Sequence, residues 1–79
     1  RAVKRGADTA LKRRFGDAVR RARADLGISQ EELAHRAGIH RTYIGDVERG
    51  ARNPGLVNIC RIAKALEVDA SDLLSGIRL

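Results

Sequence analysis

Hydrophobic residues recur every three or four positions along most of the chain, which is the spacing of one face of an α-helix. In the N-terminal third these positions are Leu11, Phe15, Val19, Ala22 and Leu26. Asp8 or Thr9 can cap the start of this helix, and Gly27 can adopt the left-handed conformation that ends it. We therefore expect one amphipathic helix from about residue 9 to residue 26.

Two shorter helices follow, separated by a tight turn. Ser29 and Glu32 fit a capping box, in which each side chain accepts a hydrogen bond from the other residue's backbone amide. Gly38 closes the first of these helices, and the second runs from Arg41 to about Arg49. The inner positions are Leu33, Ala34 and Ala37 in the first helix, and Ile44 and Val47 in the second.

The last third of the chain predicts two more helices after a turn. Pro54 biases Asn53 away from helix, which places a turn before the fourth helix. The apolar positions of the fourth helix are Leu56, Ile59, Ile62, Ala63 and Leu66. Asp69 can cap a short fifth helix. No segment predicts a strand, so the predicted fold is all-α, a compact five-helix bundle joined by short connections.

Length and composition exclude several classes of protein. The 79 residues allow one domain with a small core. The single cysteine, Cys60, excludes an internal disulfide framework and a cysteine-based zinc site, and indicates a reducing, cytoplasmic setting. His35 and His40 without a third ligand make a poor metal site, and we expect no cofactor. No apolar run reaches the ~18 residues of a membrane span.

The positive charge is concentrated at the N-terminus. Residues 1–23 hold nine Lys and Arg against two Asp, and the whole chain has a net charge of +6. Residues 1–8 lack apolar periodicity and contain Gly6, so we expect a basic arm, with disorder as one possibility, ahead of a single domain over residues 9–79. Such a segment indicates a polyanionic partner, most often nucleic acid, although a solvated helix face is the alternative.

Residues 27–50 predict a helix-turn-helix. Two short helices are joined by Gly38-Ile39-His40, and the small side chains of Ala34 and Ala37 allow them to approach closely. Such a pair can place its second helix in the major groove of DNA. The spacing alone leaves the alternative of an αα-corner that binds nothing.

The residues themselves carry a family resemblance. They are the runs Gly27-Ile28-Ser29-Gln30-Glu31-Glu32-Leu33-Ala34, Ala37-Gly38-Ile39, Thr42-Tyr43-Ile44, Val47-Glu48-Arg49-Gly50, Asn53-Pro54 and Ile62-Ala63-Lys64-Ala65-Leu66. Together they resemble the phage-repressor (Cro-like, XRE) helix-turn-helix family, over roughly Phe15 to Leu74. The size and the Arg41-Thr42-Tyr43-Ile44 run are similar to the controller proteins of restriction–modification systems, which are small dimeric regulators.

The resemblance implies that the second motif helix contacts DNA bases. Positions similar to Arg41, Thr42 and Asp46 read base edges in the family. Arg41 can donate two hydrogen bonds to guanine, and the Thr42 methyl can contact a thymine methyl. A carboxylate facing DNA is repelled by phosphates, so Asp46 either accepts from a cytosine amine or, as we prefer, orients Arg41 within the helix.

Contacts with the DNA backbone are expected on both sides of the recognition helix. The resemblance implies that Gln30 contacts the backbone and braces this helix, and that the loop carrying Arg49, Arg52 and Asn53 grips phosphates. For Arg52 the alternative is a solvated loop charge. Because Ile44 already serves the inner face, we expect the Tyr43 hydroxyl to contact a phosphate, with semi-buried packing as the alternative.

Glu48 has a structural role in this interpretation. Members of the family often pair this acid with an arginine of the first helix, and the matching residue here is Arg23. A buried pair would fix the angle between the first and third helices. Gly45 lies inside the recognition helix and costs about 1 kcal/mol relative to alanine, which indicates a close approach either to DNA or to a neighbouring helix.

Two recognition helices are needed for useful specificity, because one short helix contacts only a few base pairs. Apolar residues near the C-terminus, together with part of the fourth helix, predict an isologous homodimer interface. They are Leu73, Leu74, Ile77 and Leu79. Core packing is the alternative for one of the two adjacent leucines, and Cys60 is better explained as a small core or interface residue than as a redox sensor.

The predicted function is sequence-specific regulation of transcription by a homodimer on a pseudo-palindromic, double-stranded operator, with RNA polymerase as a possible partner and no membrane. The alternative is an antitoxin-type interaction module with the same fold. The few residues after Leu74 disfavour it, because they are too short to wrap a partner. No catalytic constellation or phosphate-binding loop indicates an enzyme. RNA binding is also disfavoured, because Tyr43 is the only plausible aromatic residue for stacking on RNA bases.

Overall fold

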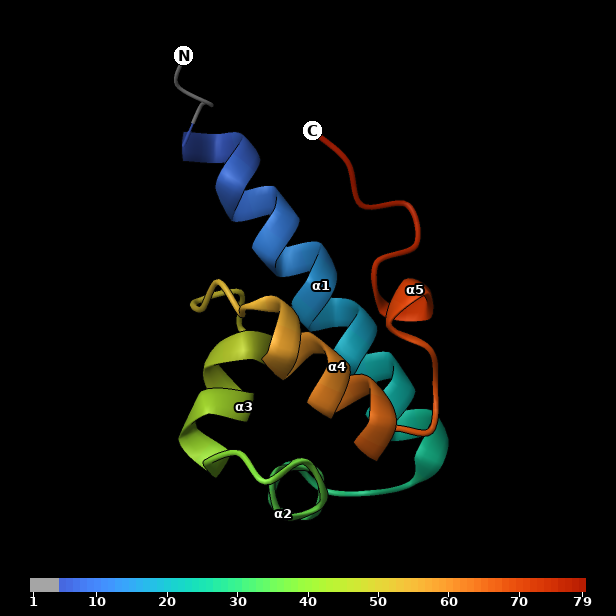
Figure 1. Ribbon diagram of the computed structural model, residues 1–79. Helices are drawn as coiled ribbons and strands as arrows, with labels where there is room; N and C mark the ends of the chain where they lie inside the picture. Colours follow the sequence, from blue (N-terminus) through green and yellow to red (C-terminus); the bar gives the residue numbers. More distant parts are fainter. Residues whose placement is uncertain (1–4) are drawn as a thin grey trace.

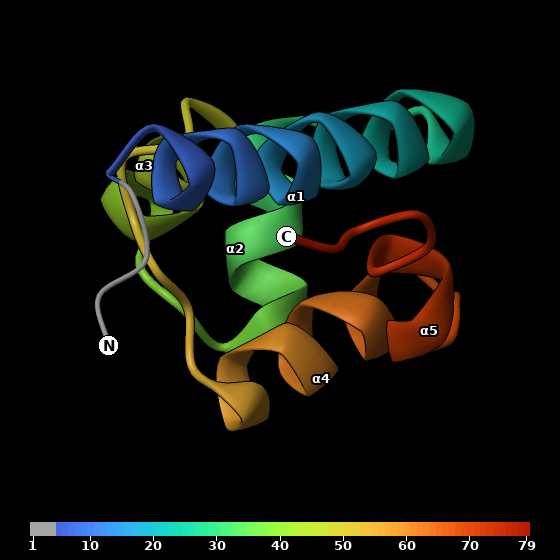
Figure 2. The same cartoon turned by 90° about the horizontal axis from the view of Figure 1, so that it is seen from above.

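The computed structural model describes residues 5–79, which form five α-helices (Figure 1). Their bounds are α1 Arg5–Leu26, α2 Gln30–Ala37, α3 Arg41–Glu48, α4 Leu56–Ala65 and α5 Ala70–Leu73. Helix α1 lies along one side of the other helices and contacts α3 and α5, while α2 contacts α3 and α4 (Figure 2). The predicted all-α, five-helix fold is confirmed.

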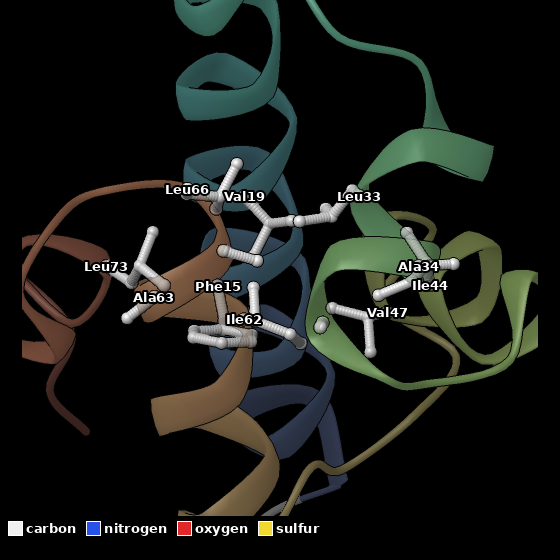
Figure 3. Close-up of a cluster of buried hydrophobic side chains, with 12 residues drawn as sticks. Phe15, Val19, Leu33, Ala34, Ile44, Val47, Ile62, Ala63, Leu66 and Leu73 are labelled. Atoms are coloured by element: carbon white, nitrogen blue, oxygen red, sulfur yellow. The ribbon is translucent and has the colours of Figure 1, made fainter.

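The core lies where all five helices converge (Figure 3). Its buried residues are Phe15, Val19, Leu33, Ala34, Ala37, Ile44, Val47, Ile62, Ala63, Ala65, Leu66 and Leu73. Val19, Leu33, Ile44 and Ile62 are fully buried. Burial of such a side chain is worth about 1.5–3 kcal/mol, so these contacts hold α3 in place although a helix of eight residues is marginal by itself.

Helix α1 begins earlier than its apolar stripe predicts. It starts at Arg5, so residues 5–8 are helical rather than part of an irregular arm. Residues 1–4, the rest of that segment, lie outside the described residues. The apolar stripe marks only the turns of a helix that pack on the core. A helix that is already nucleated extends by further turns at little cost, and those turns need no apolar residue.

Two local predictions are wrong. The Ser29 hydroxyl accepts from the Glu32 amide at 3.0 Å, but the Glu32 carboxylate pairs with Arg36 at 2.8 Å instead of completing the capping box. Leu56, predicted on the inner face of α4, is 72% exposed. It is the first residue of that helix, which begins at the glycine cap Gly55, and the inner face becomes buried only farther along, at Ile62 and Ala63.

Within residues 5–79, no helix combines the length and the apolar character required to cross a membrane.

Candidate nucleic-acid interface

The turn between α2 and α3 sets the direction of α3. Gly38 has φ of 67°, in the left-handed region that glycine adopts without strain, and Ile39 donates its amide to the Ala34 carbonyl at 3.0 Å. Helix α3 then begins at Arg41, after His40. The side chain of His40 makes no capping hydrogen bond. The turn is thus made by the backbone.

Helix α3 has one buried and one open side. Ile44, Val47 and Glu48 are buried, while Arg41 and Thr42 are exposed. The side that carries Arg41 and Thr42 therefore packs on no other helix of residues 5–79. A duplex can reach it without any rearrangement of the core.

Gly16 allows α1 and α3 to lie in direct backbone contact. A Cβ atom at this position would lie 2.3 Å from the Val47 carbonyl oxygen and 2.9 Å from that of Glu48. Any side chain here would push α3 away from α1. The sequence pattern does not single out this residue, because a glycine inside an amphipathic helix does not reveal what approaches it.

Glu48 ties α3 to α1 and α2. Its Oε2 accepts from Arg23 Nε at 2.7 Å, and its Oε1 accepts from Arg23 Nη2 at 2.9 Å and from Gln30 Nε2 at 3.0 Å. Arg23 also donates to the Ile28 carbonyl at 3.0 Å. The structure therefore brings together the pair that the resemblance implied. It also places Gln30 as the expected brace.

These contacts keep Glu48 ionised inside the protein. Burial opposes ionisation most strongly, but the hydrogen bonds from Arg23 and Gln30 and the charges of Arg23 and Arg20 together outweigh it, so the pKa of Glu48 lies below its ordinary value. The hydrogen bond to Glu48 in turn raises the pKa of Arg23. The side chain of Glu48 is 2% exposed and that of Arg23 is 18% exposed. The pair is therefore a buried clamp on α3.

Asp46 does not orient Arg41, contrary to our prediction. Its carboxylate binds Arg49, three residues later, and Arg52 Nη2 at 3.3 Å. Residues three apart are neighbours on a helix surface, whereas residues five apart are rotated by about 140° from each other. Arg41 and Asp46 therefore start from different sides of α3, and the carboxylate pairs with Arg49 and Arg52 instead.

Tyr43 is half-buried and packs against the core, so the semi-buried alternative describes its ring. The Arg52 guanidinium lies over that ring, 4.7 Å from its centroid. Arg52 is thus held between the Tyr43 ring and the Asp46 carboxylate. It is not simply a solvated loop charge.

The loop after α3 returns to the N-terminal half of α1 (Figure 1). Gly50 has φ of 74°, and a Cβ on it would lie 3.1 Å from the Arg13 Cα atom. Asn53 is exposed and shares a shallow pocket with Lys12. Two basic residues of α1, Lys12 and Arg13, therefore lie beside the loop that is expected to grip phosphates. The count of charged residues predicts the basic segment, but it does not show that Lys12 and Arg13 lie beside this loop.

Comparison with known proteins identifies the family. A family model described as helix-turn-helix, HTH_3, matches residues 19–73. The chain belongs to the HTH_3 helix-turn-helix family. It is accordingly a DNA-binding regulator of transcription and not an enzyme.

Several relatives of this HTH_3 chain are named as control proteins. It is 52% identical over 61 residues to control protein C.BamHI of Bacillus amyloliquefaciens, covering 76% of this chain and 75% of the relative. It is 43% identical over 65 residues to control protein C.SmaI of Serratia marcescens, covering 82% and 77%. Among solved structures, the restriction–modification controller protein C.AhdI of Aeromonas hydrophila superposes with a TM-score of 0.80 at 45% identity, covering 81% of this chain and 97% of that one.

The residues expected at the dimer interface of this helix-turn-helix protein differ from one another in how far they are exposed. Leu73 is 2% exposed and belongs to the core, so it is not available to a second chain. Leu74 and Leu79 are 38% and 76% exposed, and Ile77 is half-buried against the core. Val57, which the apolar periodicity does not single out, is 64% exposed at the start of α4.

Proposed function

We propose that this chain controls restriction–modification genes by binding, as a homodimer, a pseudo-palindromic operator. The single observation that carries the proposal is the open side of α3, with Arg41 and Thr42 exposed above a helix clamped by Glu48. The similarity to a restriction–modification controller protein, C.AhdI, supports the choice of restriction–modification genes.

In this mechanism, Arg41 and Thr42 enter the major groove and read base edges. Gln30, Arg49, Arg52 and Asn53 contact phosphates on either side and supply most of the affinity. The half-buried Tyr43 ring supports Arg52, and its hydroxyl reaches a phosphate.

The dimer places two copies of α3 about 34–36 Å apart, one helical turn of DNA. Leu74, Ile77 and Leu79 form the two-fold interface with the exposed start of α4. Leu74 and Ile77 line an apolar groove that also includes Pro54 and Ile59, and a second chain would remove this surface from water. Repression then follows from occlusion of the promoter, and activation from a contact with RNA polymerase.

The test is selection of bound duplexes from a random pool, followed by affinity measurements on the selected site. We expect a pseudo-palindrome, which would report the half-site spacing and the symmetry together. Arg41→Ala should cost about 1–3 kcal/mol on the selected site and relax the preference at one position of each half-site. Arg52→Ala should instead lower the affinity for the selected site without changing the base preferred at any position. An unenriched pool, or equal losses for Arg41→Ala on selected and scrambled DNA, would contradict the proposal.

A further inference from the structure

Asp46 is an acid at the edge of the surface proposed for DNA, where a carboxylate is repelled by phosphates. Its side chain is 21% exposed and its two partners are arginines, Arg49 and Arg52. A negative charge here lowers the attraction of the surface for any duplex, whatever its sequence. The arrangement must therefore be explained by what Asp46 does to its partners.

The three side chains form a network on one edge of the interface. Arg49 lies three residues beyond Asp46 on the same side of the helix, and its side chain remains 67% exposed. Arg52 comes from the loop and lies over the Tyr43 ring, with 47% of its side chain exposed. The two guanidiniums and one carboxylate carry a net charge of +1, half of what the arginines would present alone.

Both arginines keep donors directed to solvent while they share one carboxylate. When a duplex fits the open side of α3, its phosphates come close to Arg49 and Arg52. They can then compete with the Asp46 carboxylate for these two arginines. A duplex that does not fit stays farther away, where salt screens its phosphates and the carboxylate retains the arginines. The competition therefore favours the matching duplex.

We propose that Asp46 is a specificity-determining residue of this interface, which withholds Arg49 and Arg52 from DNA that does not fit α3. The inference rests on the proposed function and extends it. Asp46 lowers the affinity for unrelated duplexes more than the affinity for the operator, and so raises the ratio between the two.

Asp46→Asn tests the proposal, with Asp17→Asn as the matched control. Asp17 pairs with Arg20 at 2.5 Å, also three residues apart, and lies in a pocket with Ser75 and Gly76 near α5. Both variants remove one negative charge; Asp46→Asn releases two arginines and Asp17→Asn releases one. Only Asp46→Asn acts on Arg49 and Arg52, the arginines proposed to contact phosphates; Arg20 instead donates to the Glu48 carbonyl at 3.4 Å.

The measurements are the dissociation constants for an unrelated duplex and for the selected operator at 50 and 200 mM salt, with thermal melting to verify folding. For Asp46→Asn on the unrelated duplex we expect tighter binding and a salt slope steeper by about 0.9, which is one more phosphate contact and about a further 3.5-fold loss between these salt concentrations. Affinity for the operator should rise less, so the ratio should fall. A purely structural role would move the melting temperature and leave the salt slope unchanged.

A protein that lacks both arginines separates the effect of the arginine network from the effect of removing one negative charge. In the Arg49→Gln/Arg52→Gln protein, Asp46→Asn should change the affinity no more than Asp17→Asn does. If the parent protein binds DNA but Asp46→Asn behaves like Asp17→Asn in every background, this inference fails alone. If the parent binds no duplex, or binds all duplexes equally, the proposed function fails as well.

Discussion

Replacing Glu48 by glutamine tests whether the buried clamp holds the recognition helix. The amide places a donor where Glu48 now accepts from Arg23 or Gln30, and it leaves the Arg23 charge without its partner. Removal of one member of a buried ion pair costs about 3–5 kcal/mol. Because Arg23 is 18% exposed and can reach water, we expect the lower end, about 3 kcal/mol.

Such a loss is large for a domain of this size. A change of 1 kcal/mol shifts the melting temperature of a 60–100-residue domain by about 4–8 °C, so we expect a decrease of about 12–24 °C. The assay is thermal unfolding followed by far-UV circular dichroism at one fixed protein concentration, because dimerisation would add a concentration dependence.

Glu32→Gln is the matched control for this prediction. It makes the same chemical change and also removes a partner of an arginine, but the Glu32–Arg36 pair lies on the surface, with the Glu32 side chain 46% exposed, and Arg36 keeps Glu67 at 3.8 Å. Surface pairs contribute little because water screens them. The reasoning is refuted if Glu48→Gln melts with the parent protein, or if the two variants lose the same amount.

The pKa of Glu48 predicts how the difference depends on pH. Because the folded-state pKa lies below the ordinary value of 4.5, the stabilisation from the charged carboxylate is complete above that pH and is lost as the pH falls through the folded-state pKa. The gap in melting temperature between the parent and Glu48→Gln should be constant near neutral pH and narrow below about 4.5.

Three further predictions concern the contacts of α1 and the proposed dimer. Gly16→Ala should destabilise the protein by about 1–3 kcal/mol in urea unfolding, because its Cβ would lie 2.3 Å from a backbone oxygen of α3, whereas Gly6→Ala, on the same helix with nothing within 4 Å, should be neutral or slightly stabilising. Lys12→Gln should reduce the salt slope of DNA binding by about 0.9, and Lys64→Gln on α4, with the same change of charge, should leave it unchanged. Leu74→Glu should shift sedimentation equilibrium toward monomer without altering the circular dichroism spectrum; a purely monomeric parent would instead remove the dimer.

The number and order of the helices could be predicted from the sequence because each buried face repeats with the helical period. The same signal fails where burial is not periodic. The apolar stripe marks only the turns of α1 that reach the core, such as those of Phe15 and Val19, so it does not predict the start at Arg5. At the end of α5, Leu73 is followed directly by the C-cap residue Leu74, and a helix of four residues is too short for its period to decide which one faces the core.

The same difference between buried and exposed positions decides which contacts of the candidate site could be predicted. The Glu48–Arg23 pair could be expected from the family resemblance, since a buried carboxylate needs a partner and few partners reach it. On the surface many partners compete. Asp46 had three arginines within six positions, and the choice of Arg49 and Arg52 over Arg41 depends on helix rotation and on where the loop after α3 folds back. That loop is placed by Gly50 against Arg13, a contact between distant parts of the chain that no local pattern encodes. The Glu48–Arg23 clamp on α3 was therefore predictable, whereas the pairing of the exposed charges around Asp46 required the fold.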